Sequence, residues 1–311
     1  MPDLPLPINA TDTLKLADWL EIYALLSPDG GSSRGDLEQV LKTSSALESD
    51  RATTTDEAIG EKCLEVFLEL EYRAKSAGAA YPFKITGGRV DLKSSMDEFS
   101  GYVFCLCLSY YRWIPKGRRK ADSNPWLLFE ELCCIAAAEF IGGDVVRFGT
   151  SRGNSNRAKS AFKRIVNDMC VKIGEGGGFR EQPTLDRKDD KIDLVAWREF
   201  EDKRPSKLIM FGQCAGGENW ASKVDELQPD IFWSQWVIEG KISALMRSFY
   251  IPHRIDESKW VYYSRRTNLL FDRCRVAYWA FRASGSVSDP RYIAWSRSVL
   301  FASPSTSRAS Y

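Results

Sequence analysis

The sequence is poor in histidine: His253 is the only one among 311 residues. A site that needs several imidazoles, such as a multi-histidine zinc or iron centre, cannot be assembled from this chain. A Ser-His-Asp or Cys-His hydrolase would have to use His253, which follows Pro252 and lies in no nucleophile motif. Metal chemistry must therefore rest on carboxylates, carbonyls and lysines, a set of groups that suits Mg²⁺.

Other signatures are absent as well. The sequence has no Walker A motif, no Cys-x-x-Cys pair and no Cys/His zinc spacing, so the eight cysteines are expected to be reduced, buried thiols. The first residues lack the basic and apolar regions of a secretory signal, and no stretch approaches 18 uninterrupted apolar residues. We therefore expect a soluble, cytoplasmic protein that does not bind membranes.

The composition is that of a folded protein with an uneven charge distribution. With 44% hydrophobic and 12% aromatic residues, the chain is expected to form one large domain or two ordinary ones. Residues 1–62 are rich in acids, whereas 147–172 and 241–275 are rich in lysine and arginine. This asymmetry is compatible with a nucleic-acid face on the second half, although solvated helix surfaces explain each stretch equally well.

Helical periodicity dominates the first part of the chain. Apolar residues recur near helical spacing over 14–26 and 58–78, and 81–92 predicts a hairpin around Gly87-Gly88. The apolar stretch 99–114 predicts a buried helix, and the polar, basic stretch 115–125 marks a domain boundary. We expect a mostly helical N-terminal domain with a small β-hairpin over 1–118, a second domain over 119–301 and a disordered tail over 302–311.

The second part changes to helices followed by strands. Asn124 and Pro125 are suited to begin an apolar, buried helix, and an amphipathic helix over 157–174 is expected to end at the glycine cluster 174–178. Strands are predicted for 191–197 and 207–215, with a short one within 143–156, and further helices for 218–250 and for 265–281.

Polar residues stand at special places in this pattern. Glu130 and Glu131 lie on the apolar helix, Asp193 lies in an otherwise apolar strand, and Gln213 lies at the end of the next strand. Cutting a phosphodiester with Mg²⁺ requires hard oxygen ligands that converge on one point, which two adjacent strands and a helix packed on them can supply. A nearby lysine can then orient the attacking water and balance charge on the phosphorane.

The succession of a helix acid, a glycine-rich connection, DDKIDLVAW, a short turn and LIMFGQCA resembles the PD-(D/E)xK, or restriction-endonuclease-like, phosphodiesterase superfamily. The resemblance implies an α/β (α+β) fold with a mixed central sheet flanked by helices. Glu131 matches the helix acid, with Glu130 as its close competitor. Asp193 matches the strand aspartate, and Gln213 matches the first position of the (Glu/Gln)-x-Lys motif on the next strand. Variants with glutamine occur in nucleases of prokaryotic defence and restriction systems, whose effectors this chain resembles.

The chain departs from the superfamily pattern at Ala215, where the lysine should stand. Because the superfamily can relocate this lysine to a neighbouring element, Lys223 is the expected substitute and Lys207 a weaker one. If neither lysine reaches the site, the fold would bind nucleic acid without cutting it.

The resemblance thus implies hydrolysis of DNA by a metal-activated water, with Mg²⁺ or Mn²⁺ as cofactor. Glu131, Asp193 and the backbone carbonyl of Cys214 would hold the metal, Gln213 would place the metal or the water, and Lys223 would act at the scissile phosphate. An anti-phage defence role would make the N-terminal domain a sensor or a docking surface for other subunits. Two alternatives stay open: an RNA-cutting enzyme, and a non-catalytic nucleic-acid-binding or scaffold subunit on the same fold.

Simpler structural roles compete with several of these functional ones. Lys159, Lys163 and Arg164 either contact phosphates of the nucleic acid or form a solvated helix face. Asp193 could be a salt-bridged strand acid, and Gln213 could satisfy backbone groups at a strand end. Asp189 and Asp190 are expected to be turn residues.

Overall fold

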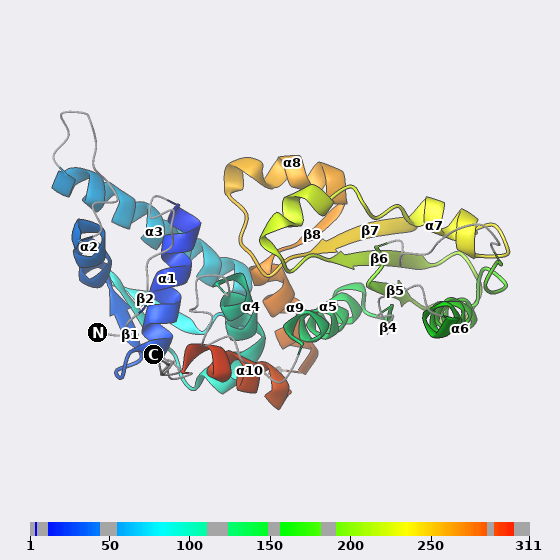
Figure 1. Ribbon diagram of the computed structural model, residues 1–311, viewed down its shortest axis with the longest axis horizontal. Coiled ribbons are helices and arrows are strands. Elements are labelled where there is room, and N and C mark those ends of the chain that lie inside the picture. Colours follow the sequence, from blue (N-terminus) through cyan, green and yellow to red (C-terminus); the bar gives the residue numbers. More distant parts are fainter. Residues whose placement is uncertain are drawn as a thin grey trace, which may run out of the picture. The chain divides into compact units, whose positions relative to one another are not determined.

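The computed structural model describes residues 4, 12–43, 55–110, 124–148, 156–181, 191–284 and 289–301 (Figure 1). The chain divides into two compact units: unit 1 comprises 1–125, 253–256 and 273–311, and unit 2 comprises 126–252 and 257–272. The expected tail over 302–311, the acids at 189 and 190, and the boundary at 118/119 lie outside the described residues. Within the described ranges, no helix has the length and apolar character needed to cross a bilayer.

Unit 1 is mostly helical and contains a small antiparallel sheet. Its elements are α1 (Thr13–Leu26), β1 (Gly31–Ser33), α2 (Arg34–Thr43), α3 (Thr55–Ala77), η1 (Gly78–Ala80), β2 (Phe83–Thr86), β3 (Arg89–Leu92), η2 (Met96–Phe99), α4 (Ser100–Tyr110), α9 (Arg273–Ser284) and α10 (Pro290–Leu300). The predicted hairpin is confirmed as β2–β3, and β1 joins β3 to give the order β1-β3-β2. The predicted buried helix is confirmed as α4, all of whose residues are buried.

The last two helices pack in unit 1, although the sequence predicts them in the domain over 119–301. Both α9 and α10 contact α4. The ring of Phe104 on α4 lies 5.2 Å from that of Tyr292 and 5.1 Å from that of Trp295 on α10. The C-terminal helices therefore complete the hydrophobic core that the N-terminal helices begin.

A buried ionic cluster joins three helices of unit 1. Arg73 of α3 lies 2.8 Å from both Asp18 and Glu21 of α1, and Arg273 of α9 lies 2.8 Å from Asp18 and 3.3 Å from Glu21. All four side chains are buried. Burial raises the pKa of Asp18, but the charges of Arg273 and Arg73 outweigh it and hold this pKa well below its usual range. At Glu21, by contrast, burial outweighs the charges of Arg73 and Arg273 and raises the pKa, so the arginines and acids depend on one another away from water.

Unit 2 contains a mixed sheet flanked by helices. Its elements are α5 (Pro125–Ile141), β4 (Asp144–Arg147), α6 (Asn156–Ile173), β5 (Leu194–Arg198), β6 (Leu208–Cys214), η5 (Glu218–Lys223), α7 (Pro229–Trp236), β7 (Leu245–Tyr250), α8 (Glu257–Thr267) and β8 (Leu269–Phe271). In the order β4-β5-β6-β7-β8, the first three strands are antiparallel and the last three are parallel. The expected mixed sheet with flanking helices is therefore confirmed.

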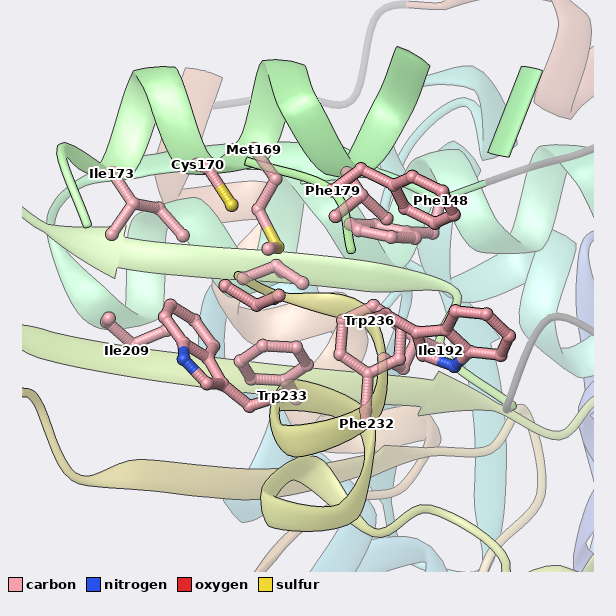
Figure 2. Packing of buried hydrophobic residues seen from close by; sticks show 14 of the residues in the cluster. Phe148, Met169, Cys170, Ile173, Phe179, Ile192, Ile209, Phe232, Trp233 and Trp236 are labelled. Atoms are coloured by element: carbon pink, nitrogen blue, oxygen red, sulfur yellow. The ribbon is translucent and has the colours of Figure 1, made fainter. Parts of the chain in front are cut away.

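An aromatic core lies between one face of this sheet, α6 and α7 (Figure 2). The predicted apolar stripe of α6 faces it, with Phe162 edge-on to Trp236 at a centroid distance of 5.4 Å. Phe211 of β6 packs against Phe232 and Trp233 of α7, at 5.7 and 6.4 Å. As predicted, α6 ends at the glycine cluster, where Gly174 adopts a φ of 72°.

Two strands replace helices that the sequence analysis expects. Residues 245–250 form β7, whereas helical structure in 218–250 is confined to η5 and α7. Within 265–281, α8 ends at Thr267, β8 follows, and α9 begins at Arg273. Asn268 has a φ of 61°, a left-handed conformation that an α-helix cannot continue through. This residue ends α8 and turns the chain into β8.

The C-terminus of α5 is fixed against β5 by two glycines. Gly142 has a φ of 65°, and the N–H groups of Gly142 and Gly143 donate to the carbonyls of Glu139 and Ala138. This is a Schellman motif, which satisfies carbonyls at the helix end. A Cβ atom on Gly143 would lie 2.0 Å from the backbone oxygen of Trp197. The close approach sets where α5, the helix with the predicted acids, meets the sheet.

Arg73→Met should destabilise unit 1 strongly, because it leaves two buried acids with one arginine. We expect a loss of about 3–5 kcal/mol in the free energy of unfolding, measured by urea denaturation. Arg34→Met is the matched control, because Arg34 forms an exposed pair with Glu38, and this change should cost about 1 kcal/mol or less. Equal effects of the two substitutions would contradict the role given to the cluster.

Gly143→Ala should destabilise unit 2, because the new methyl group meets backbone that is held in the β4–β5 ladder. We expect a loss of about 2 kcal/mol or more in the free energy of unfolding. Gly240→Ala is the control, because no atom lies within 4 Å of a Cβ at that position. An unchanged urea midpoint for Gly143→Ala would show that α5 can move away from the sheet without cost.

Candidate functional site

Asp193 lies immediately before β5, at one end of the antiparallel ladders that β5 forms with β4 and β6. Its N–H donates to the carbonyl of Gly212 at 2.9 Å, and its own carbonyl accepts from the N–H of Phe148 at 2.7 Å. Its side chain turns onto the end of β6, where Oδ2 accepts a hydrogen bond from the N–H of Cys214 at 2.6 Å. The neighbouring strands thus hold both the backbone and one carboxylate oxygen of this residue.

Gln213 lies at the same end of the sheet. The last regular pair between β5 and β6 is Leu194 with Gly212, so Asp193 and Gln213 are the next residues along each strand. The side chain of Gln213 is buried, and its Nε2 donates to Glu226 Oε2 at 2.9 Å. Its Oε1 is buried and accepts no hydrogen bond from the described residues. Such an oxygen costs about 1–3 kcal/mol unless a cation or a water satisfies it.

Of the two helix acids, Glu130 forms an ion pair with the sheet. Its carboxylate lies 3.1 Å from Arg147 Nη1 on β4. Burial raises the pKa of the Cys214 thiol well above its usual range, and the nearby charges of Asp193 and Glu130 raise it further. Glu131 is the next residue on α5, so its side chain points about 100° away around the helix axis. It is half-buried.

The predicted lysines have different surroundings. Lys207 precedes β6, and its buried ammonium lies 2.5 Å from Glu199 Oε1. At about 3.3 Å per strand residue it is about 20 Å from Gln213, so it does not reach the site. Lys223 is the last residue of η5, and its carbonyl accepts from the N–H of Glu226 at 3.0 Å. Lys223 therefore lies one turn from the acid that binds Gln213.

Two residues near the site were not among the candidates from the sequence. Glu226 binds the amide of Gln213, and Lys191 Nζ lies 3.8 Å from the same Glu226 oxygen. Lys191 begins the strand predicted over 191–197, but in the structure it lies in a turn with a φ of 64°, and β5 begins only at Leu194. Glu226 had no signal in the sequence, because it lies in an irregular turn between η5 and α7.

The basic residues Lys159, Lys163 and Arg164 are exposed on α6. They lie away from the stripe with Phe162 and Val166 that faces the core. Lys163 Nζ lies 2.5 Å from Glu181 Oε1 in an exposed ion pair. Their exposure is what either a phosphate-binding surface or a solvated helix face requires.

All eight cysteines are free, as predicted, and seven of them are buried, whereas Cys214 is half-buried. Cys133 and Cys134 of α5 lie near Cys214, where the helix covers the end of β6. Burial raises the pKa of the neighbouring Tyr250, and these three cysteines raise it further. Burial raises the pKa of Cys134 well above its usual range, and the pKa of Cys105 and Cys107 in unit 1 to about 12. These thiols are small apolar groups of the two cores.

The donors at this end of the sheet are of the kind that Mg²⁺ prefers. In the described part of the chain, no three His, Cys, Asp or Glu side chains are grouped so that they could hold a metal ion. The carboxylate of Asp193 is instead accompanied by the amide oxygen of Gln213, with Glu130 nearby. Cys214 directs its N–H toward Asp193, and strand geometry directs its carbonyl to the same side. Oxygen donors of the hard type therefore lie at the ends of two adjacent strands.

Comparisons of this chain with family models, with curated proteins and with solved structures find no match.

The buried thiols should react slowly with Ellman's reagent (DTNB) at pH 8. Because burial raises their pKa, little of the reactive thiolate exists at that pH. We expect fewer than about one thiol per chain to react within minutes in buffer, and all eight to react in guanidinium chloride. Prompt reaction of Cys214, located by mass spectrometry, would show that the end of β6 is open to solvent.

Proposed function

We propose that unit 2 is a metal-dependent nuclease that hydrolyses phosphodiester bonds in DNA. The observation that carries this proposal is that Asp193 and Gln213 lie at the ends of two adjacent strands, and that Oε1 of Gln213 is buried without a hydrogen bond from the described residues. The mixed sheet flanked by helices agrees with what the resemblance to the PD-(D/E)xK superfamily implies. The order of helix acid, strand aspartate and strand glutamine along the chain supports it as well.

The residues present fit Mg²⁺ or Mn²⁺. Asp193, Gln213 Oε1 and the Cys214 carbonyl would hold the ion, with Glu130 or Glu131 supplying a further carboxylate. The donor set consists of oxygens, as Mg²⁺ requires, and Gln213 Oε1 would gain the partner that it lacks. When bound, the ion supplies a more acidic water and an electrophile for the phosphate oxygen.

The protein's own groups would orient the reactants. The Cys214 N–H fixes Oδ2 of Asp193, so the other carboxylate oxygen keeps one direction. A lysine ammonium would help to orient the attacking water and would balance the charge that develops on the phosphorane. Lys223 and Lys191 are the candidates, since both lie next to Glu226. The bond from phosphorus to the leaving oxygen breaks as the water oxygen attacks.

A non-catalytic nucleic-acid-binding subunit is the second candidate function. Ala215 and the pairing of Lys207 with Glu199 favour it, because two positions that could supply the ammonium do not. In either case the exposed side chains of Lys159, Lys163 and Arg164 on α6 would contact phosphates of the nucleic acid. We further propose, from the resemblance alone, an anti-phage role in the cytoplasm in which unit 1 binds other subunits.

Asp193→Asn should abolish cutting, because it removes a charged ligand. We expect the unsubstituted protein to cut plasmid DNA with Mg²⁺ or Mn²⁺ and not with EDTA, and the variant to lose about 100-fold or more in rate. Asp202→Asn, which changes an exposed turn acid, is the control and should keep full activity.

Circular single-stranded DNA and structured RNA tested in parallel identify the substrate. If the protein cuts only RNA, its substrate is RNA and not DNA. Binding of DNA without cutting under all of these conditions would favour the binding subunit instead.

A further inference from the structure

The side-chain amide of Gln213 is held by a hydrogen bond to Glu226. A glutamine side chain ends in one acceptor and one donor of nearly equal size, so a free amide could present either. Here Nε2 donates to Glu226 Oε2 at 2.9 Å. A rotated amide would place Oε1 against a carboxylate oxygen, with no proton between the two acceptors. The hydrogen bond therefore selects one orientation.

In that orientation the acceptor is left for a ligand. Gln213 is only 4% exposed, and its Oε1 has no hydrogen-bond donor among the described residues. An electropositive partner is the group that such an atom lacks. A cation held by Asp193 would supply it, because the two residues end adjacent strands.

Lys191 forms an ion pair with Glu226, the acceptor for the Gln213 amide. Its Nζ lies 3.8 Å from the oxygen of Glu226 that accepts from Gln213. The ammonium balances the charge of the carboxylate in a partly exposed ion pair. Glu226 side-chain atoms are 33% exposed, so replacing them leaves the core unchanged.

We propose that Glu226 is a positioning residue that turns the Gln213 carbonyl oxygen toward the bound metal ion. This inference rests on the proposed function, since it assumes that Asp193 and Gln213 hold the ion. It predicts that the hydrogen bond of Glu226, and not its charge, governs metal affinity.

The test measures Mn²⁺ binding by the electron paramagnetic resonance signal of the free ion, for the full chain without nucleic acid. We expect Glu226→Ala and Glu226→Leu to weaken binding about tenfold, as loss of an outer hydrogen bond does at other metal sites. Glu226→Gln should bind like the unsubstituted protein, because its amide oxygen can still accept from Gln213 Nε2. Asp225→Ala is the matched control: it removes the neighbouring charge, which pairs with Arg266, and should leave binding unchanged.

Each outcome separates the two proposals. If Glu226→Ala and Glu226→Leu, folded by circular dichroism, bind Mn²⁺ normally while Asp193→Asn does not, the positioning role is wrong and the metal site stands. If Glu226→Gln binds as weakly as Glu226→Ala, the charge matters and the positioning role is again wrong. If the unsubstituted protein binds no Mn²⁺ and cuts no nucleic acid, both proposals fall.

Discussion

Strand β6 is constrained on both edges and on both faces, and the candidate site is built on its end. It pairs with β5 on one edge and with β7 on the other, and its interior residues are buried. A Cβ on Gly212 would lie 2.7 Å from Leu194 and 2.9 Å from Tyr250, so a larger residue there would push its neighbours away. Because β6 cannot shift, the directions of Gln213 and of the Cys214 N–H are fixed before any ligand binds.

In unit 1, a buried ionic cluster holds together helices that come from opposite ends of the chain. Arg273 lies more than two hundred residues after Asp18, yet both belong to one buried cluster. Tyr81 and Tyr102 donate to Glu21 at 2.8 and 2.9 Å, so the acid has partners besides the arginines. A buried charge without partners is costly, so this cluster favours the one arrangement of helices that satisfies all of its members.

Helices and strands whose apolar residues recur with a clear period were predictable from the sequence, and those without one clear period were not. The stripe of α6, the apolar segments of β5 and β6, and the hairpin at Gly87 each follow from local sequence. Strand β7 has half-buried residues at 245–247 and buried ones after them, so it shows neither alternation nor a helical stripe. Strand β8 is three residues long, too short for a period, and only the left-handed Asn268 separates it from α8.

By itself, the sequence determined the types of ligand available: with one histidine, sites that need several imidazoles were excluded, and polar residues in apolar strands marked Asp193 and Gln213. The tertiary structure decided which residues meet them, joining Glu226 to Gln213 and Lys191 to Glu226 and leaving Lys207 with Glu199. The physical reason is that periodicity reports the face of an element, whereas contacts between elements depend on register, helix rotation and turn geometry. These are set by packing across the whole unit.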